Sequence, residues 1–327
     1  MTGSSTCPVP VIDFAPFLHG DTAAKAEVAQ GLDNAFQNVG FVYLQNHGVN
    51  LKRVEEAFGW SKELGGSHHR GYSGIGVEKV IQSKQDRLAK EDLEALRAIP
   101  DHKESFETGN VDDELQPNIW VPEEEIPGFR GFMESFFTDC STLVHQILRA
   151  MATALSLPSE DQLSKTHSRS LFQTRLLRYP PLPAPTLRKG EKSRISAHSD
   201  FGTLTLLFQD STGGLEVEDP FSPDIFRPAT PIPGTVLVNI GDLMERWSNG
   251  RWRSTVHRVV APPVDEAKSE QSGEEILKAR YSIPFFATAD PETVIEALPG
   301  CWNEERPKRF EKTTAWEYVQ MRMAASY

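Results

Sequence analysis

Two histidines and one aspartate are spaced so that they could hold a metal ion together. His198 and Asp200 stand two positions apart, directly before the apolar run 204–208. Because side chains two positions apart on a strand point to the same face, we expect this imidazole and carboxylate to converge. His257 follows 59 positions after His198 and is expected on a neighbouring strand. Two imidazoles and one carboxylate form the facial triad that holds Fe(II) and leaves coordination positions open for other ligands.

A second pair of residues has the chemistry to bind an acid. Arg280 and Ser282 are again two positions apart, in Arg-Tyr-Ser-Ile-Pro-Phe-Phe, so both should project from one face of a strand. A guanidinium beside a hydroxyl suits a carboxylate, and a buried guanidinium requires an anion. Taken alone, an arginine near a serine in a strand is more often a surface salt-bridge residue. The position of Arg280, 23 residues after His257, favours the binding role.

Composition and charge limit the classes of protein that this chain can be. The 327 residues are 39% apolar and 24% charged, which is typical of one globular unit with a sizeable core. A net charge of −12 opposes binding to nucleic acid or to an anionic membrane. The cysteines Cys7, Cys140 and Cys301 show no pairing motif, which favours a reducing compartment. The start of the chain is no secretory signal and no apolar run reaches about 18 residues, so we predict a cytoplasmic protein.

The elements that must position these residues follow from periodicity and breakers. Helices are expected over 23–39, 51–64, 128–155 and 314–325, an edge strand over 9–14, and a glycine-rich loop over 67–76. Further strands are expected over 40–44, 171–179, 195–208, 214–218, 234–239, 257–261 and 280–286. This pattern predicts an α+β fold, in which helices from both ends brace a double-stranded β-helix, or jelly-roll, core. We expect one unit, 1–327, with a helix-rich N-terminal region over 1–165, a jelly-roll catalytic core over 166–290 and a helical segment over 291–327.

Several motifs together resemble a known family. They are Val-Pro-Val-Ile-Asp-Phe at 9–14, Gly-Phe-Val-Tyr-Leu-Gln-Asn-His-Gly at 40–48, Arg-Tyr-Pro-Pro at 178–181, and the stretch 198–286. Together they cover nearly the whole chain, and they resemble the isopenicillin N synthase-like branch of the Fe(II)/2-oxoglutarate dioxygenases. The pattern is most similar to the fungal members, which modify alkaloids, polyketides, terpenoids or pyrimidines. The chain is shorter than these relatives between Trp60 and the loop that follows Gly66.

The resemblance implies roles for six residues. They are the iron ligands His198, Asp200 and His257, the 2-oxoglutarate carboxylate ligands Arg280 and Ser282, and a further hydroxyl donor, Tyr179, whose alternative is a core tyrosine. The implied enzyme hydroxylates or otherwise oxidises a small organic metabolite, in secondary or catabolic metabolism, with O2 and 2-oxoglutarate. Succinate and CO2 are released, and ascorbate supports the iron. Tyr72, Phe106 and Phe201 are candidates for the substrate pocket, although aromatic residues are more often core.

Two other functions fit the same residues. A 2-oxoglutarate-independent Fe(II) oxidase of the same branch would share the Arg-x-Ser pair but would form no succinate and CO2. A non-catalytic jelly-roll binding protein would keep the scaffold and give no absorption band with Fe(II) and 2-oxoglutarate. A zinc hydrolase is disfavoured, because the sequence has no His-Glu-x-x-His helix to supply a general base. The sequence makes no prediction of the substrate or the oligomeric state.

Overall fold

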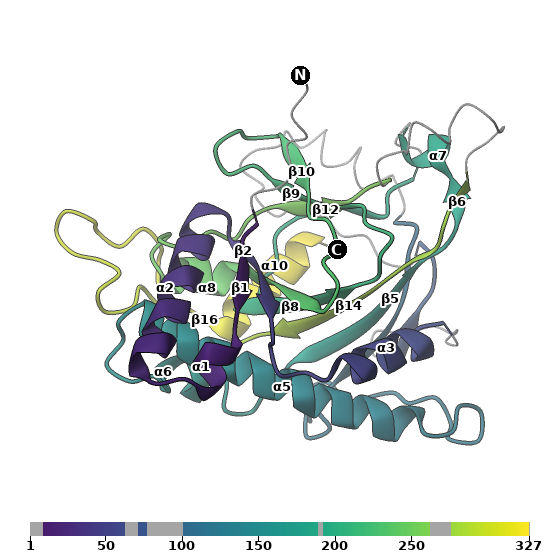
Figure 1. Ribbon diagram of the computed structural model, residues 1–327, viewed down its shortest axis with the longest axis horizontal. Helices are drawn as coiled ribbons and strands as arrows, with labels where there is room; N and C mark the ends of the chain where they lie inside the picture. Colours follow the sequence, from purple (N-terminus) through teal and green to yellow (C-terminus); the bar gives the residue numbers. More distant parts are fainter. Residues whose placement is uncertain (1–8, 63–70, 77–100, 189–191, 262–275, 327) are drawn as a thin grey trace.

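Two facing β-sheets form the centre of the protein in a computed structural model, which describes residues 9–62, 71–76, 101–188, 192–261 and 276–326 (Figure 1). The large sheet has the order β1 (Val11–Asp13), β2 (Phe41–Gln45), β11 (Thr235–Ile240), β8 (Leu204–Gln209), β14 (Arg280–Ala287), β5 (Gln173–Tyr179), β4 (Glu104–Gly109) and β3 (Gly71–Ser73). The small sheet has the order β10 (Phe226–Pro228), β9 (Leu215–Glu218), β12 (His257–Val259) and β7 (Ile195–His198). Two short pairs join β13 (Ile276–Leu277) to β6 (Leu182–Pro183) and β15 (Val294–Ile295) to β16 (Thr313–Thr314). This is the predicted jelly roll.

Helices brace the large sheet on its outer side. They are α1 (Ala15–His19), α2 (Thr22–Asn38), α3 (Leu51–Trp60), α5 (Phe129–Ala154) and α6 (Gln162–Lys165), and α5 runs along the sheet in Figure 1. The short helices α7 (Ala184–Arg188) and α8 (Asp242–Trp247) lie between strands, and α10 (Ala315–Ser326) ends the described chain. Among the described residues, no helix is both long and apolar enough to cross a membrane.

Strict alternation in the large sheet separates its helix-covered face from its inner face. In β8, Leu204, Leu206 and Phe208 belong to the core shared with the helices, whereas Thr205 and Leu207 line the space between the sheets. The same alternation in β5 and β14 turns eight side chains inward: Gln173, Arg175, Leu177, Tyr179, Arg280, Ser282, Pro284 and Phe286. The inner face therefore combines apolar groups with the polar groups that could do chemistry.

Most of the predicted elements are confirmed, and the structure adds several short helices and strands that were not predicted. The predicted strand 195–208 is two strands, β7 and β8, which belong to different sheets. Between the two strands, Gly202 packs so closely on the large sheet that a Cβ atom would lie 2.5 Å from the Ala287 carbonyl oxygen. Residues 71–73 of the predicted loop form β3, and β4 was not predicted. Residues 63–70, which include most of the segment predicted to be shorter than in relatives, lie outside the described residues.

Candidate metal centre

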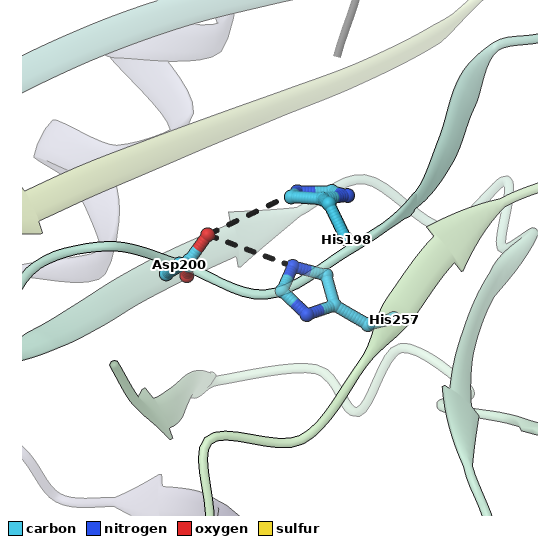
Figure 2. Close-up of side chains that lie close together, drawn as sticks. All are labelled: His198, Asp200 and His257. Carbon is cyan, nitrogen blue, oxygen red and sulfur yellow. Dashed lines mark ion pairs between the residues drawn. The ribbon is translucent and has the colours of Figure 1, made fainter. Parts of the chain in front are cut away.

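The imidazoles of His198 and His257 and the carboxylate of Asp200 converge between the two sheets (Figure 2). The Asp200 Oδ1 atom lies 3.9 Å from Nε2 of His198 and 3.8 Å from Nε2 of His257. One ligand atom from each of the three side chains lies within 4.8 Å of the others. A divalent transition-metal ion binds such donors at about 2.0–2.2 Å, so one ion can bridge this spacing. Two nitrogens and one oxygen on one side of an ion fit Fe(II).

Strand pairing brings the two histidines together, as the sequence predicted. His198 ends β7, His257 begins β12, and the two residues are direct partners in the antiparallel pair. Their ring centroids lie 4.3 Å apart. Asp200 corrects the prediction, because it is not on the strand with His198 but two residues beyond its end. The convergence of Asp200 with the histidines therefore has a cause other than strand alternation.

Backbone hydrogen bonds from the start of α8 fix the loop that carries Asp200. The amide of Asp242 donates to the Asp200 carbonyl at 2.9 Å, and the amide of Leu243 donates to the Gly202 carbonyl at 3.1 Å. This approach requires a glycine at position 241, where a Cβ atom would lie 2.2 Å from the Gly202 carbonyl oxygen. The start of α8, and not a neighbouring strand, therefore holds the loop that carries Asp200.

In each of the three side chains, the atom that faces away from the metal position (the outer atom) has a hydrogen-bond partner. The atom that faces the metal position (the inner atom) is left to bind the ion. Nδ1 of His198 lies 2.8 Å from the Ser196 carbonyl, and Nδ1 of His257 lies 3.2 Å from the Thr255 carbonyl. A proton on each Nδ1 leaves the Nε2 lone pair directed at the metal position. Asp200 Oδ2 accepts from Thr205 at 2.5 Å and from Asn239 at 2.7 Å. Sequence reasoning missed Thr205 and Asn239, which lie in apolar strands where a buried polar residue is itself a signal.

The protonation states also suit a metal ion. Burial, followed by the proximity of His257, lowers the pKa of His198 to about 3, so its imidazole is neutral at neutral pH. Burial acts to raise the pKa of Asp200, but His257, His198 and the hydrogen bonds from Asn239 and Thr205 together lower it below its usual value. The site thus presents a neutral imidazole and an ionised carboxylate, the forms that coordinate metals.

A cavity of about 810 Å³ opens beside the three metal-site residues, and the three residues predicted to bind 2-oxoglutarate line it. Arg280, Ser282 and Tyr179 line it, and each is only 1% exposed. Arg280 donates to Ser282 Oγ at 2.9 Å and to Gln209 Oε1 at 3.1 Å, and its guanidinium carbon lies 5.0 Å from the Tyr179 ring centroid. Burial raises the pKa of Tyr179, so its hydroxyl keeps its proton and can donate.

A second buried arginine near Arg280 was not predicted. Arg194 is fully buried, and its guanidinium carbon lies 5.8 Å from the centroid of the Tyr179 ring. Burial and the nearby Arg280 lower the pKa of Arg194 to about 10, which still leaves it charged at neutral pH. Among the described residues, neither arginine has a carboxylate within 4.0 Å. This end of the cavity is therefore strongly positive and can hold an anion.

Helix α10 covers part of the cavity and contacts the loop between the metal-site residues. Its Trp316, Val319 and Met323 side chains line the cavity. Arg322 forms a buried ion pair with Asp242 and donates to the Ser199 carbonyl at 3.4 Å. The predicted C-terminal helix is thus confirmed at the cavity, while its action as a lid stays a prediction.

The three aromatic candidates for the substrate pocket have different positions. Phe201 lines the cavity and lies under the guanidinium of Arg322, 4.2 Å from its carbon atom. Phe106 belongs to the core instead and packs edge-on against Phe129, with ring centroids 5.2 Å apart. Tyr72 packs against the same core and donates a hydrogen bond to Glu104. Only the first of the three therefore lines the space beside the metal-site residues.

Comparison with known proteins gives matches over most of the chain. A family model described as the 2OG-Fe(II) oxygenase superfamily matches residues 169–289. A second, described as the N-terminal region of the non-haem dioxygenase in morphine synthesis, matches residues 9–66. The 2-oxoglutarate-dependent dioxygenase frbA of Dothideomycetidae sp. (strain 11243) is 39% identical over 340 residues, which cover 98% of this chain and 97% of that protein. The proline hydroxylase buaE of Petromyces alliaceus is 36% identical, with 97% and 98% covered.

Solved structures give the same result in three dimensions. A full-length Neurospora crassa protein, crystallised in complex with alpha-KG, superposes with a TM-score of 0.82 at 35% identity, over 97% of this chain and 96% of that chain. The complex of the same protein with alpha-KG and thymine also has a TM-score of 0.82, at 36% identity, over 98% and 97%. The similarity extends over both sheets and the surrounding helices.

Proposed function

The chain belongs to the 2OG-Fe(II) oxygenase superfamily, and from this premise we propose how its own residues divide the work of oxidation. The protein is a non-haem Fe(II)- and 2-oxoglutarate-dependent oxygenase that oxidises a small organic molecule. For a hydroxylation, one oxygen atom of O2 enters succinate and the other enters the substrate, and 2-oxoglutarate loses CO2. When bound, Fe(II) supplies the activation of O2 that couples these two oxidations.

We propose that His198, Asp200 and His257 hold the iron. The observation that carries this proposal is the convergence of their three inner atoms, while hydrogen bonds occupy the outer atoms. The side chains behind them contribute orientation, because Thr205 and Asn239 fix which carboxylate oxygen faces the ion. The protein therefore presents a prearranged set of donors and leaves the opposite side of the ion to the cavity.

Arg280, Ser282 and Tyr179 are proposed to bind the distal carboxylate of 2-oxoglutarate. Support comes from the charge of Arg280, which among the described residues is hydrogen-bonded only to neutral groups. Its Nε atom is buried and lacks a partner within the described structure. A carboxylate would satisfy that donor and offset the cost of burying the charge. Arg194 adds positive potential behind Tyr179 without lining the cavity.

The substrate is proposed to be a small metabolite that enters the remaining part of the cavity. The relatives support this size class, because one is named a proline hydroxylase and one structure contains thymine. A volume of about 810 Å³ is enough for 2-oxoglutarate and a small molecule side by side. A cytoplasmic location is proposed from the cysteine pattern, which shows no pairing motif.

Anaerobic titration of the protein with Fe(II) and 2-oxoglutarate tests the proposal. We expect a metal-to-ligand charge-transfer absorption band, followed by succinate and CO2 formation when O2 and ascorbate are added. Substrate oxidation without succinate would favour the 2-oxoglutarate-independent oxidase. Failure to form the absorption band would favour the non-catalytic binding protein.

A further inference from the structure

Helix α10 turns two neighbouring faces toward the interior of the protein. Trp316, Val319 and Met323 lie on one face and line the cavity. Tyr318 and Arg322 are four positions apart, so they lie together on the other face. That second face contacts α8 and the loop between the metal-site residues. The same helix is therefore in contact with both the cavity and the structure around the metal site.

Arg322 joins α10 to the loop that carries Asp200. Its side chain is 7% exposed and pairs with the carboxylate of Asp242, the first residue of α8. Its Nη2 atom donates to the Ser199 carbonyl at 3.4 Å, and its guanidinium carbon lies 4.2 Å from the centroid of the Phe201 ring. Ser199 and Phe201 are the residues on either side of Asp200. Arg322 thus contacts both sequence neighbours of a metal-site residue.

Asp242 connects α10 to the same loop by a second route. Its side chain belongs to the contact with α10, because Oδ2 accepts from the Tyr318 hydroxyl at 3.0 Å in addition to the ion pair with Arg322. Its backbone belongs to the contact with the loop, because the amide donates to the Asp200 carbonyl at 2.9 Å. A displacement of Arg322 would therefore reach the loop directly, through Ser199, and indirectly, through Asp242.

The contact between α10 and the loop is a charged one. Burial lowers the pKa of Arg322 to about 10, so its guanidinium stays protonated at neutral pH. The negative charge of Asp200 acts against this shift, as expected for two side chains that lie near each other. The ion pair with Asp242 offsets the cost of burying the Arg322 charge. Because water screens buried charges weakly, this contact should fix the position of the helix on the loop.

From these contacts we infer that Arg322 is a positioning residue for the metal site, which holds the loop 199–202 so that Asp200 faces the ion. Because the same helix lines the cavity, the placement of α10 and the affinity for the ion should depend on each other. Thermodynamic linkage makes that dependence reciprocal, so metal binding should also stabilise α10. The inference rests on the proposed function, since it adds a residue to the metal site proposed there.

Titration with Co(II) alone tests the role of Arg322 without turnover. The visible absorption of bound Co(II) depends on its ligands, so one titration reports both affinity and geometry. Arg322→Met keeps a long side chain but removes the charge and the donors, and it should bind Co(II) about 5- to 100-fold more weakly, with an altered spectrum. Arg322→Lys keeps the charge that pairs with Asp242 and should recover part of the affinity. Unchanged affinity in Arg322→Met would overturn the inference.

A matched control separates this role from general packing of α10. Arg246→Met removes an arginine whose guanidinium carbon lies 5.0 Å from the centroid of the Tyr318 ring. Within the described structure Arg246 forms no hydrogen bond or ion pair with the loop 199–202. This variant should bind Co(II) within about twofold of the unsubstituted protein. An equal loss of affinity in Arg246→Met and Arg322→Met would refute a specific role of Arg322.

Hydrogen exchange measures the reciprocal effect. In the unsubstituted protein, Co(II) should slow exchange of the amides of 316–323 by at least about fivefold, and in Arg322→Met this slowing should be lost. A residue that only stabilised the fold would change exchange equally with and without the ion. If Co(II) does not slow exchange in α10 of the unsubstituted protein, the inference is wrong, and this result does not require the variant to fold.

Failure of this inference can be told apart from failure of the proposed function. If the Fe(II)–2-oxoglutarate absorption band forms but Arg322→Met binds Co(II) normally, the inference alone is wrong. If the band does not form in the unsubstituted protein, the proposed function is wrong as well.

Discussion

Arg280 and Arg175 line one cavity from neighbouring strands, and they differ in what surrounds their guanidinium groups. Arg280 is hydrogen-bonded to the neutral side chains Ser282 and Gln209, whereas Arg175 is paired with the carboxylate of Glu107. Within the described part of the chain the first has no counterion, so an incoming anion could neutralise its charge, whereas the second already has one. The surroundings of each arginine, more than the arginine itself, determine whether it is suited to bind an acidic ligand.

Oxidation requires the metal ion whichever ligands the cavity binds, so the loss of a metal-site residue should have the largest effect. Asp200→Ala removes the only carboxylate of the triad, and we expect Fe(II) binding and succinate formation to fall below detection while the fold is retained. Circular dichroism and iron content would be measured beside activity. Glu296→Ala, which breaks the exposed pair with Lys308, is the control and should behave like the unsubstituted protein. Undiminished activity of Asp200→Ala would remove the metal assignment.

Substitutions of Arg280 and Arg175 should differ in their effect on the 2-oxoglutarate requirement. Arg280→Ala should raise the 2-oxoglutarate concentration needed for half-maximal rate by about 10- to 150-fold, because a charge-assisted hydrogen bond contributes about 1.5–3 kcal/mol. Arg175→Ala should leave that concentration within about threefold, because Arg175 precedes Tyr179 by four residues on β5 and so lies about 13 Å from it along the strand. Succinate formation against 2-oxoglutarate concentration gives both values. Equal effects of the two substitutions would mean that Arg280 has no particular role in binding 2-oxoglutarate.

A smaller effect is expected for Asn239, which orients a metal ligand and does not bind the ion itself. Asn239→Ala removes a hydrogen bond to Asp200 Oδ2 but keeps the bond from Thr205. Loss of such a supporting contact typically costs about 10- to 100-fold in metal affinity. Competition between the protein and a chelator measures the affinity, and excess Fe(II) should restore turnover. If excess iron does not restore activity, Asn239 has a role beyond orienting the carboxylate.

The sequence predicted the residues of the site better than the geometry that joins them. The types and spacing of His198, Asp200 and His257 were sufficient to propose the site once the motifs downstream of them were taken into account. Strand alternation gave the wrong reason for Asp200, since the loop that carries it depends on contacts with Gly241 and Asp242, about forty residues away in the sequence. The alternation of side chains with a period of two holds within one strand, and it does not predict where that strand ends.

The ion pair between Arg175 and Glu107 could not be predicted, for a related reason. Glu107 and Arg175 are 68 positions apart, and β4 was not recognised as a strand. Without the pairing of β4 with β5, neither residue differs from an ordinary surface charge. Arg280 was predictable because its neighbour Ser282 is close in sequence, whereas the counterion of Arg175 is close only in space. Local spacing reveals a site when its members share one strand.

The different surroundings of Arg280 and Arg175 should also affect the stability of the metal-free protein. Replacing each arginine with methionine should change the free energy of unfolding in opposite directions. Arg280→Met removes a buried charge that has no counterion among the described residues, so unfolding should cost the same free energy or up to about 2 kcal/mol more. Arg175→Met removes the guanidinium that pairs with the buried carboxylate of Glu107, and unfolding should cost about 1–3 kcal/mol less. Urea denaturation of both variants, without 2-oxoglutarate, makes the comparison. A loss of stability in both would show that Arg280 has a counterion in the free protein.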